Sequence, residues 1–304
     1  MASPKEESER LHTALFGKNR EETCLDVIIN NDLGGRIEIA KAYGKAYKNP
    51  LYEDIKSKLS GNFKELAGYL FLTPFEFYAK MLKRVFKGLS VDESIIFEIL
   101  CCHTQDEYKQ IEAAYKKETK KDLSKDIGKN FSGAIKKNLL NIISTPRRIN
   151  ENPDKELCEK LADKLISAGE GNWVSDDKLF KQVFIECSVN ELVLVCRYYY
   201  QKTGNNIIDI IEKKCSGKNK TLLREIVFGT IIPHELYAEK IRSAIKGLGT
   251  NNALLNRVLA ERCQLDMPEI KEIYGHKYNI TLREDIIGDT SGIYQKLFLF
   301  VAEC

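Results

Sequence analysis

The sequence has no long apolar run, no Cys-x-x-Cys pair and little histidine. No stretch of about 18 apolar residues occurs among the 304 residues, which excludes a membrane-spanning helix. The nine cysteines are odd in number and scattered, so we expect reduced thiols rather than a disulfide scaffold or a zinc site. The polar start of the chain predicts no secretory signal peptide. These absences together predict a cytoplasmic protein.

Motifs of common catalytic sites are absent as well. The sequence contains no Gly-x-x-x-x-Gly-Lys, no His-Glu-x-x-His and no nucleophile elbow. Its four histidines, His12, His103, His234 and His276, stand apart from one another. The net charge of +3 is too small a bias to indicate binding to nucleic acid. We therefore expect a binding or structural protein, not an enzyme, with no nucleic-acid partner.

What the sequence does contain is an internal repeat. A Ser-Gly pair recurs at intervals of 72, 84 and 75 residues, and a glycine precedes each pair by 44 to 48 residues. This paired spacing predicts four repeats of about 70–80 residues. The pairs are Ser60-Gly61, Ser132-Gly133, Ser216-Gly217 and Ser291-Gly292, and the preceding glycines are Gly17, Gly88, Gly169 and Gly247.

Apolar residues within each repeat recur at helical spacing. In the second repeat Phe75, Tyr78, Leu82 and Val85 follow one another at steps of three or four, as on one face of a helix. No segment alternates as a strand does, so the sequence predicts an all-α fold with about five helices per repeat. The predicted division is a head at 1–10, repeats at 11–73, 74–145, 155–230 and 231–304, and a polar, proline-containing linker between halves at 146–154.

The fourth repeat contains a loop suited to a cation. Its sequence is Ile245-Lys-Gly-Leu-Gly-Thr250, and Asp289 follows Gly249 by 40 residues. Carbonyl oxygens of Ile245, Gly247 and Gly249 with a bidentate Asp289 would supply five of the six to eight oxygens that Ca²⁺ takes. From spacing alone, the alternative is a glycine that ends a helix and a solvated aspartate. Either Thr250 or Asn251 is a candidate N-cap for the next helix.

This loop and the Gly288-Asp-Thr-Ser-Gly292 segment together resemble the endonexin motif of the annexins. The loop at Ala168-Gly-Glu-Gly-Asn-Trp-Val-Ser175 is similar to the third-repeat loop of that family, and the resemblance covers the chain after residue 10. The short head and the eroded loops also resemble the alpha-giardins, divergent protist annexins.

The resemblance implies a curved disc of four five-helix repeats that binds acidic phospholipids through bridging Ca²⁺. It matches the carbonyls of Ile245, Gly247 and Gly249 and the carboxylate of Asp289 to the calcium ligands. A peripheral location at the inner face of the plasma membrane, or association with the cytoskeleton, follows as an expectation.

The other three repeats depart from this pattern. Where annexins carry an acid two residues before the Ser-Gly pair, this chain has Lys58, Asn130 and Lys214. Asn19 and Ser90 stand where the first and second loops should have a glycine. A lysine cannot coordinate a cation and repels it, so we expect the main calcium sites of these three repeats to be lost.

Four side chains are candidates for contact with lipid. Lys58 and Lys214 would do without calcium what calcium does elsewhere, either by neutralising loop carbonyls or by meeting a lipid phosphate. The alternative is that both are solvated surface lysines. Lys246 is a further basic candidate. Trp173, the single tryptophan, lies in a loop and is interpreted either as a wedge into the headgroup region or as local packing.

Two functions from different classes remain open. One is calcium-dependent peripheral binding to acidic phospholipids with one preserved site in the fourth repeat. The other is a calcium-independent structural scaffold that keeps the fold and binds cytoskeletal proteins. The intact fourth loop favours the first function, and the lost acids favour the second.

Overall fold

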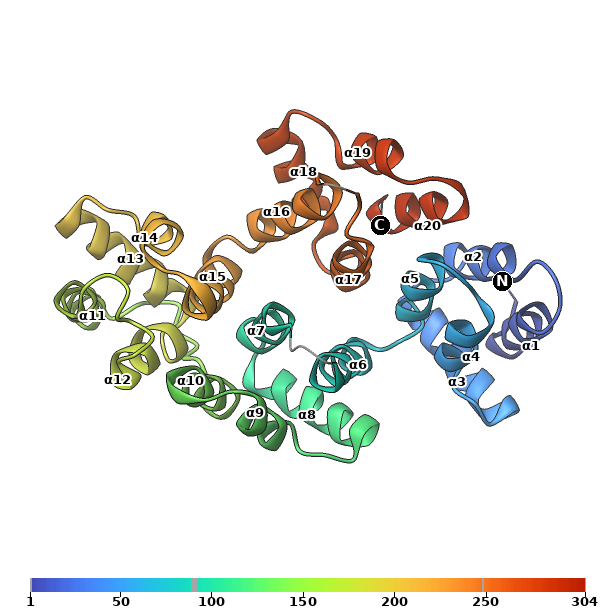
Figure 1. The fold of residues 1–304 in the computed structure, drawn as a ribbon, viewed down its shortest axis with the longest axis horizontal. Coiled ribbons are helices and arrows are strands. Elements are labelled where there is room, and N and C mark those ends of the chain that lie inside the picture. The colour runs from blue at the N-terminus through green and yellow to red at the C-terminus, as the bar shows by residue number, and fades with distance from the viewer. Residues whose placement is uncertain (1, 89–91, 248, 304) are drawn as a thin grey trace. The chain divides into compact units, whose positions relative to one another are not determined.

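The computed structural model describes residues 2–88, 92–247 and 249–303, and every regular element in these ranges is a helix (Figure 1). This confirms the predicted all-α fold, with five helical segments in each successive group. The first group is α1 (Pro4–Leu15), α2 (Arg20–Ile29), α3 (Leu33–Tyr47), α4 (Leu51–Lys58) and α5 (Phe63–Tyr69). The second is α6 (Pro74–Lys87), α7 (Glu93–Cys101), α8 (Gln105–Thr119), α9 (Leu123–Asn130) and α10 (Gly133–Ser144).

The third and fourth groups follow the same order. The third is α11 (Lys155–Ala168), α12 (Asp177–Phe180) continued by the π-helix η1 (Lys181–Ile185), α13 (Val189–Thr203), α14 (Ile207–Lys214) and α15 (Gly217–Ile231). The fourth is α16 (Pro233–Ile245), α17 (Asn252–Arg262), α18 (Met267–Tyr278), α19 (Leu282–Asp289) and α20 (Gly292–Glu303).

Each Ser-Gly pair lies at the junction between the fourth and fifth helices of its group. The four glycines have φ of +59° at Gly61, +58° at Gly133, +55° at Gly217 and +64° at Gly292. This left-handed conformation strains a residue that has a Cβ, so glycine is the residue that turns the chain there. The spacing that predicted the repeats therefore marks one sharp turn, made four times.

A buried tyrosine–aspartate hydrogen bond also repeats. Tyrosine OH and aspartate Oδ2 are 2.7 Å apart in the first group, 2.6 Å in the second and 2.5 Å in the fourth. In the third group the buried Tyr199 stands at the same place in its helix, but Ile210 replaces the aspartate. The three bonds are Tyr43 to Asp54, Tyr115 to Asp126 and Tyr274 to Asp285.

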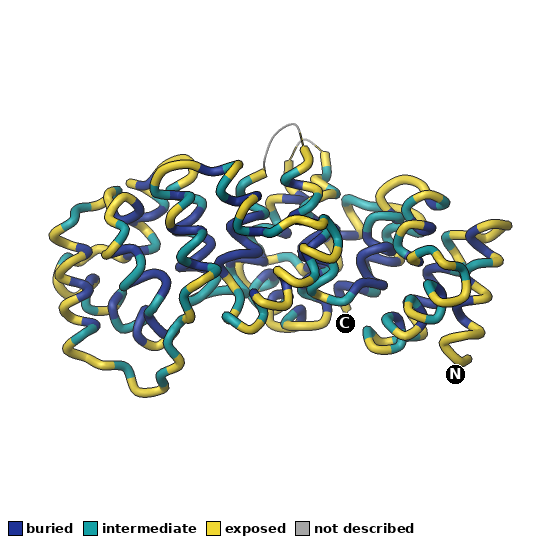
Figure 2. The backbone as a smooth tube through the Cα atoms, turned by 90° about the horizontal axis from the view of Figure 1, so that it is seen from below, coloured by how far each residue is buried: buried dark blue, intermediate teal, exposed yellow. Residues whose placement is uncertain are grey.

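Contacts divide the chain into two compact units that do not follow chain order. Unit 1 joins Met1–Phe77 to His234–Cys304, and unit 2 is Tyr78–Pro233. The core of unit 1 accordingly draws side chains from both of its segments, such as Leu15 and Phe298. Buried and exposed positions alternate along individual helices (Figure 2).

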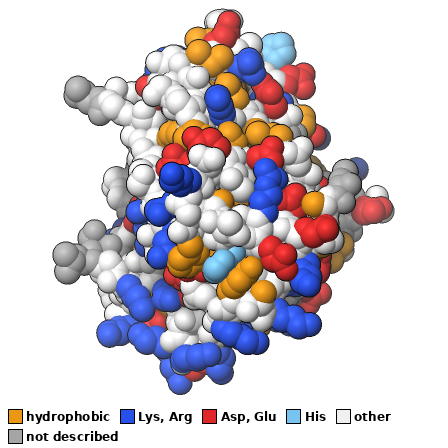
Figure 3. All heavy atoms as spheres, turned by 90° about the vertical axis from the view of Figure 1, so that its right-hand side faces the viewer, with side chains coloured by type: hydrophobic (Ala, Val, Ile, Leu, Met, Phe, Trp, Pro, Cys, Tyr) orange, Lys and Arg blue, Asp and Glu red, His pale blue; other side chains and the backbone are white. Residues whose placement is uncertain are grey.

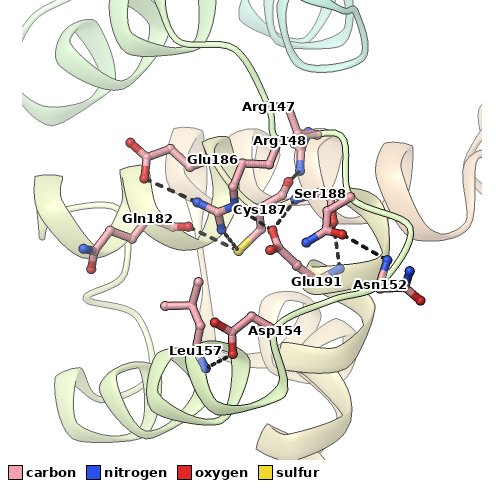
Figure 4. A network of polar contacts seen from close by, with 11 residues as sticks. Arg147, Arg148, Asn152, Asp154, Leu157, Gln182, Glu186, Cys187, Ser188 and Glu191 are labelled. Atoms are coloured by element: carbon pink, nitrogen blue, oxygen red, sulfur yellow. Dashed lines mark hydrogen bonds and ion pairs between the residues drawn. The ribbon is translucent and has the colours of Figure 1, made fainter.

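The predicted linker between halves is therefore placed wrongly, because residues 146–154 lie inside unit 2. Arg147 donates to the carbonyl oxygens of Cys187 at 2.7 Å and Phe184 at 3.0 Å. The Arg148 side chain lies 2.8 Å from the Glu191 carboxylate, and its amide donates to the Glu186 carbonyl (Figure 4). Proline and polar residues correctly indicated a segment without a helix, but they carry no information about its packing.

The predicted head also differs from the structure. Helix α1 begins at Pro4, where Ser3 and Glu6 form a capping box, so residues 4–10 are its first turns. Leu11 and Leu15 of the same helix are fully buried. The charged residues near the start are thus one face of a packed helix rather than a separate segment.

Replacement of Arg148 by alanine is expected to lower the free energy of unfolding by about 2 kcal/mol. The side chain of Glu191 is 2% exposed and that of Arg148 is 37% exposed, so the variant leaves a buried carboxylate without its cation. Urea unfolding followed by circular dichroism measures the effect. Arg197→Ala, at an exposed position on the same helix as Glu191, is the control. Equal stability of the two variants would contradict the prediction.

Candidate calcium site in the fourth repeat

The loop between α16 and α17 lies against the junction between α19 and α20. The Thr250 hydroxyl donates a hydrogen bond to the carboxylate of Asp289, which is partly exposed. Two segments that are about 40 residues apart in the sequence thus meet through side chains. The structure therefore places Asp289 beside the loop with which the sequence spacing predicted it would bind a cation.

The loop backbone is shaped by Gly249 and Asn251. Gly249 has φ of +84°, which favours glycine at that position. Asn251, rather than Thr250, caps α17, since its side chain accepts from the amide of Leu254 at 3.1 Å. The Asn251 amide donates to the carbonyl of Ala244 at 2.7 Å and closes the loop. Thr250 is left to bind Asp289, a role that the sequence analysis did not assign.

The remaining loop carbonyls suit a hard cation. Within the described ranges, no hydrogen bond ends on the carbonyl oxygens of Ile245, Gly247 or Gly249. Three carbonyl oxygens and a carboxylate form the donor set that Ca²⁺ prefers. The described residues contain no group of three or more His, Cys, Asp or Glu placed to hold a metal. The donors at this loop are mostly backbone oxygens, and they fit Ca²⁺ rather than a transition metal.

Lys246, expected at the lipid surface, pairs with a buried acid. Its ammonium is 2.9 Å from Oδ1 of Asp285. The other oxygen of this carboxylate, Oδ2, accepts hydrogen bonds from Arg242 and Tyr274. Burial raises the pKa of Asp285, but the Tyr274 and Lys246 hydrogen bonds and the positive charge of Arg242 outweigh it and hold the pKa below its usual value. The Lys246 side chain is nevertheless 52% exposed, so its contact with lipid stays a prediction beside this ion pair.

The other three repeats place different groups at the position of Asp289. The Lys58 ammonium lies 4.4 Å from the centre of the Phe16 ring. Asn130 donates to the carbonyl of Asp126 at 2.8 Å. Lys214 is exposed at the end of α14. Ser90 lies outside the described residues. The two lysines are thus accessible, and neither ammonium contacts a described loop carbonyl.

Trp173 is a core residue, which contradicts its interpretation as a wedge into the headgroup region. Its side chain is 0% exposed, and Nε1 donates to the carbonyl of Leu165 at 3.0 Å. Its ring centroid lies 5.8 Å from that of Tyr199 and 6.2 Å from that of Phe184. The alternative of local packing therefore holds, because an indole buries a large apolar area when its N–H finds a partner.

Comparison with known proteins identifies the family. The sequence model of the annexins matches residues 6–69, 77–142 and 237–301. Human annexin A13 is 30% identical over 294 residues, which are 96% of this chain and 93% of that protein. Mouse annexin A3 is 32% identical over 298 residues, with 98% and 92% covered. The chain belongs to the annexin family.

Solved annexin structures share the fold of the chain. Annexin III matches with a TM-score of 0.90 at 31% identity, over 100% of this chain and 94% of that one. Calcium-bound alpha-14 giardin matches with a TM-score of 0.80 at 15% identity, over 99% of both chains, and so shares the fold alone. The chain spans 61% of human annexin A7, at 30% identity over 97% of its own length.

Annexins as a family bind phospholipids in a calcium-dependent manner and are peripheral membrane proteins, in general without enzymatic activity. Among the described residues, no helix combines the length and the apolar character needed to cross a bilayer.

Trp173 fluorescence is expected to report a buried indole. Emission should be blue-shifted, poorly quenched by iodide, and unchanged when calcium and phosphatidylserine vesicles are added. The physical reason is that the ring is enclosed and its N–H is satisfied within unit 2. Because the chain has one tryptophan, no second indole obscures the signal. A large shift on vesicles would restore the wedge interpretation.

Proposed function

We propose that the protein binds acidic phospholipid membranes peripherally through one Ca²⁺ held by the fourth repeat, residues 231–304. The observation that carries the proposal is the contact between Thr250 and Asp289, which sets a carboxylate beside a loop with three carbonyl oxygens that accept no hydrogen bond from the described residues. The carbonyls of Ile245, Gly247 and Gly249 and the carboxylate of Asp289 would hold the ion.

The incompleteness of this donor set supports a lipid ligand. Three carbonyls and a bidentate carboxylate supply at most five oxygens, whereas calcium takes six to eight. When bound, the ion would supply positive charge and open coordination positions for a lipid phosphate. The protein's own residues would position the ligands of that ion, since Thr250 holds the Asp289 carboxylate and Asn251 closes the loop.

A single preserved site implies weak attachment. Lys58, Asn130 and Lys214 cannot replace the carboxylate in the other repeats. Both signs of charge occur on the face drawn in Figure 3. We place the protein in the cytoplasm, at the inner face of the plasma membrane when calcium rises.

A calcium-independent scaffold that binds cytoskeletal proteins is the second candidate. The observation that favours it is the loss of the acid in three of the four repeats while the helices and their turns are kept. This function would leave Asp289 without a role in binding.

Co-sedimentation with phosphatidylserine vesicles, in calcium and in chelator, separates the two candidates. Asp289→Ala should weaken calcium-dependent sedimentation at least tenfold, because loss of a metal ligand costs no less than loss of a residue that supports one. Asp209→Ala, at an exposed position in the third repeat, is the control. Sedimentation that ignores both calcium and Asp289→Ala would contradict the calcium site, and absence of sedimentation would favour the scaffold.

A further inference from the structure

The first repeat also joins its loop to its junction, but there the loop side chain donates to the backbone carbonyl of residue 58 and not to a carboxylate. In the fourth repeat Thr250 follows the left-handed Gly249 and binds Asp289, 39 residues later. In the first repeat Arg20 follows the left-handed Asn19, with φ of +57°, and binds Lys58, 38 residues later. The position of the metal-binding acid is thus basic, and the residue that reaches it from the loop is itself a cation.

The Arg20 guanidinium bridges the two segments through carbonyl oxygens. Its Nε donates to the Gly17 carbonyl at 3.3 Å, and its Nη1 donates to the Lys58 carbonyl at 3.1 Å. Gly17 stands where the fourth repeat has Gly247, one of the candidate calcium ligands. A guanidinium donates several hydrogen bonds in a fixed plane and is always charged. A covalently attached cation therefore links the loop to the junction, as calcium would.

The linked loop presents an aromatic ring among basic groups. Phe16 is 50% exposed, and the Lys58 ammonium lies over its ring at 4.4 Å from the centroid. Lys18 is exposed in the same loop and has no ion pair among the described residues. The opposing acids are Glu21 and Glu22, in the first turn of α2. An apolar ring beside lysines suits the interface of an anionic bilayer, where the ring enters and the charges meet headgroups.

The junction that Arg20 contacts is followed by a residue that bonds to the helix after the candidate calcium loop. The Asn62 carbonyl, just after the first Ser-Gly pair, accepts from Nδ2 of Asn256 at 3.4 Å. Asn256 is one helical turn from Asn252, the residue with which α17 begins after the calcium loop. Tyr294 links both asparagines, at 3.0 Å from Asn252 and 2.6 Å from Asn256. The first junction is therefore linked through side chains to the helix that follows the candidate calcium loop.

We propose that Arg20 takes the place of the calcium ion in the first repeat, and that this loop, with Phe16 and Lys58, contacts an anionic lipid bilayer without metal. The contact is separate from the calcium-dependent attachment proposed for the fourth repeat. Because each basic side chain at an anionic membrane contributes about fivefold in partition, Arg20 and Lys58 together contribute about 25-fold.

Sedimentation in chelator with phosphatidylserine–phosphatidylcholine vesicles tests the lipid contact. Wild type should bind weakly, and it should not bind phosphatidylcholine alone. The double variant Arg20→Ala/Lys58→Ala should bind about 25-fold less. The variant Lys41→Ala/Lys45→Ala removes the same charge from the exposed face of α3 and should bind as wild type does. Absence of chelator-resistant binding by wild type, or equal loss in both double variants, would overturn the proposal.

Calcium stoichiometry tests the replacement of the metal by Arg20. The triple variant Asn19→Gly/Arg20→Thr/Lys58→Asp installs the residues of the fourth repeat at the matching positions. Calorimetry should show one more Ca²⁺ per molecule than wild type binds, whether wild type binds one or none. No gain by a variant whose circular dichroism is unchanged would overturn the replacement. Loss of the fourth-repeat site alone would leave this difference intact, so the two proposals fail separately.

Discussion

The turn at each Ser-Gly pair is the constraint on which the rest of the repeat depends. A residue in the left-handed conformation turns the chain sharply between the fourth and fifth helices. That residue is glycine because the conformation strains any residue with a Cβ. The residue two positions before the Ser-Gly pair is the last of the fourth helix, and in the first and fourth repeats it lies beside the loop that follows the first helix. In the fourth repeat this residue is Asp289, and in the first it is Lys58. The fold thus repeats one position beside the loop, and this position carries an acid in the fourth repeat and a lysine in the first.

The third repeat differs from the other three in the packing of its core. Ile210 replaces the aspartate that binds the buried tyrosine elsewhere, and the freed Tyr199 packs edge-on against Trp173. The helix that follows the loop continues as a π-helix, and its Phe184 also contacts the indole. An aromatic core has replaced a polar one in this repeat. In this repeat aromatic packing therefore stands where the other three have a hydrogen bond between tyrosine and aspartate.

Long-range pairing explains where interpretation of the sequence failed. The proline-containing segment 146–154 suggested a hinge, yet Arg147 and Arg148 fasten it to carbonyls and a buried carboxylate of the third repeat. Lys246 was predicted to contact lipid, and the structure shows that its ammonium also pairs with the buried Asp285 of α19. In both cases the deciding partner lies about 40 residues away in the sequence. Composition of a segment indicates whether it forms a helix, but not which distant group neutralises its charges.

The sequence by itself determined the helical class, the fourfold repeat and the nomination of Asp289. These features rest on local rules, namely the spacing of apolar residues on a helix and the few residues that accept a left-handed turn. Only the tertiary structure decided the burial of Trp173, the union of the first and last repeats in one unit and the bridge made by Arg20. Each of these depends on which surfaces meet after the helices form, because packing pairs side chains that no local spacing brings together.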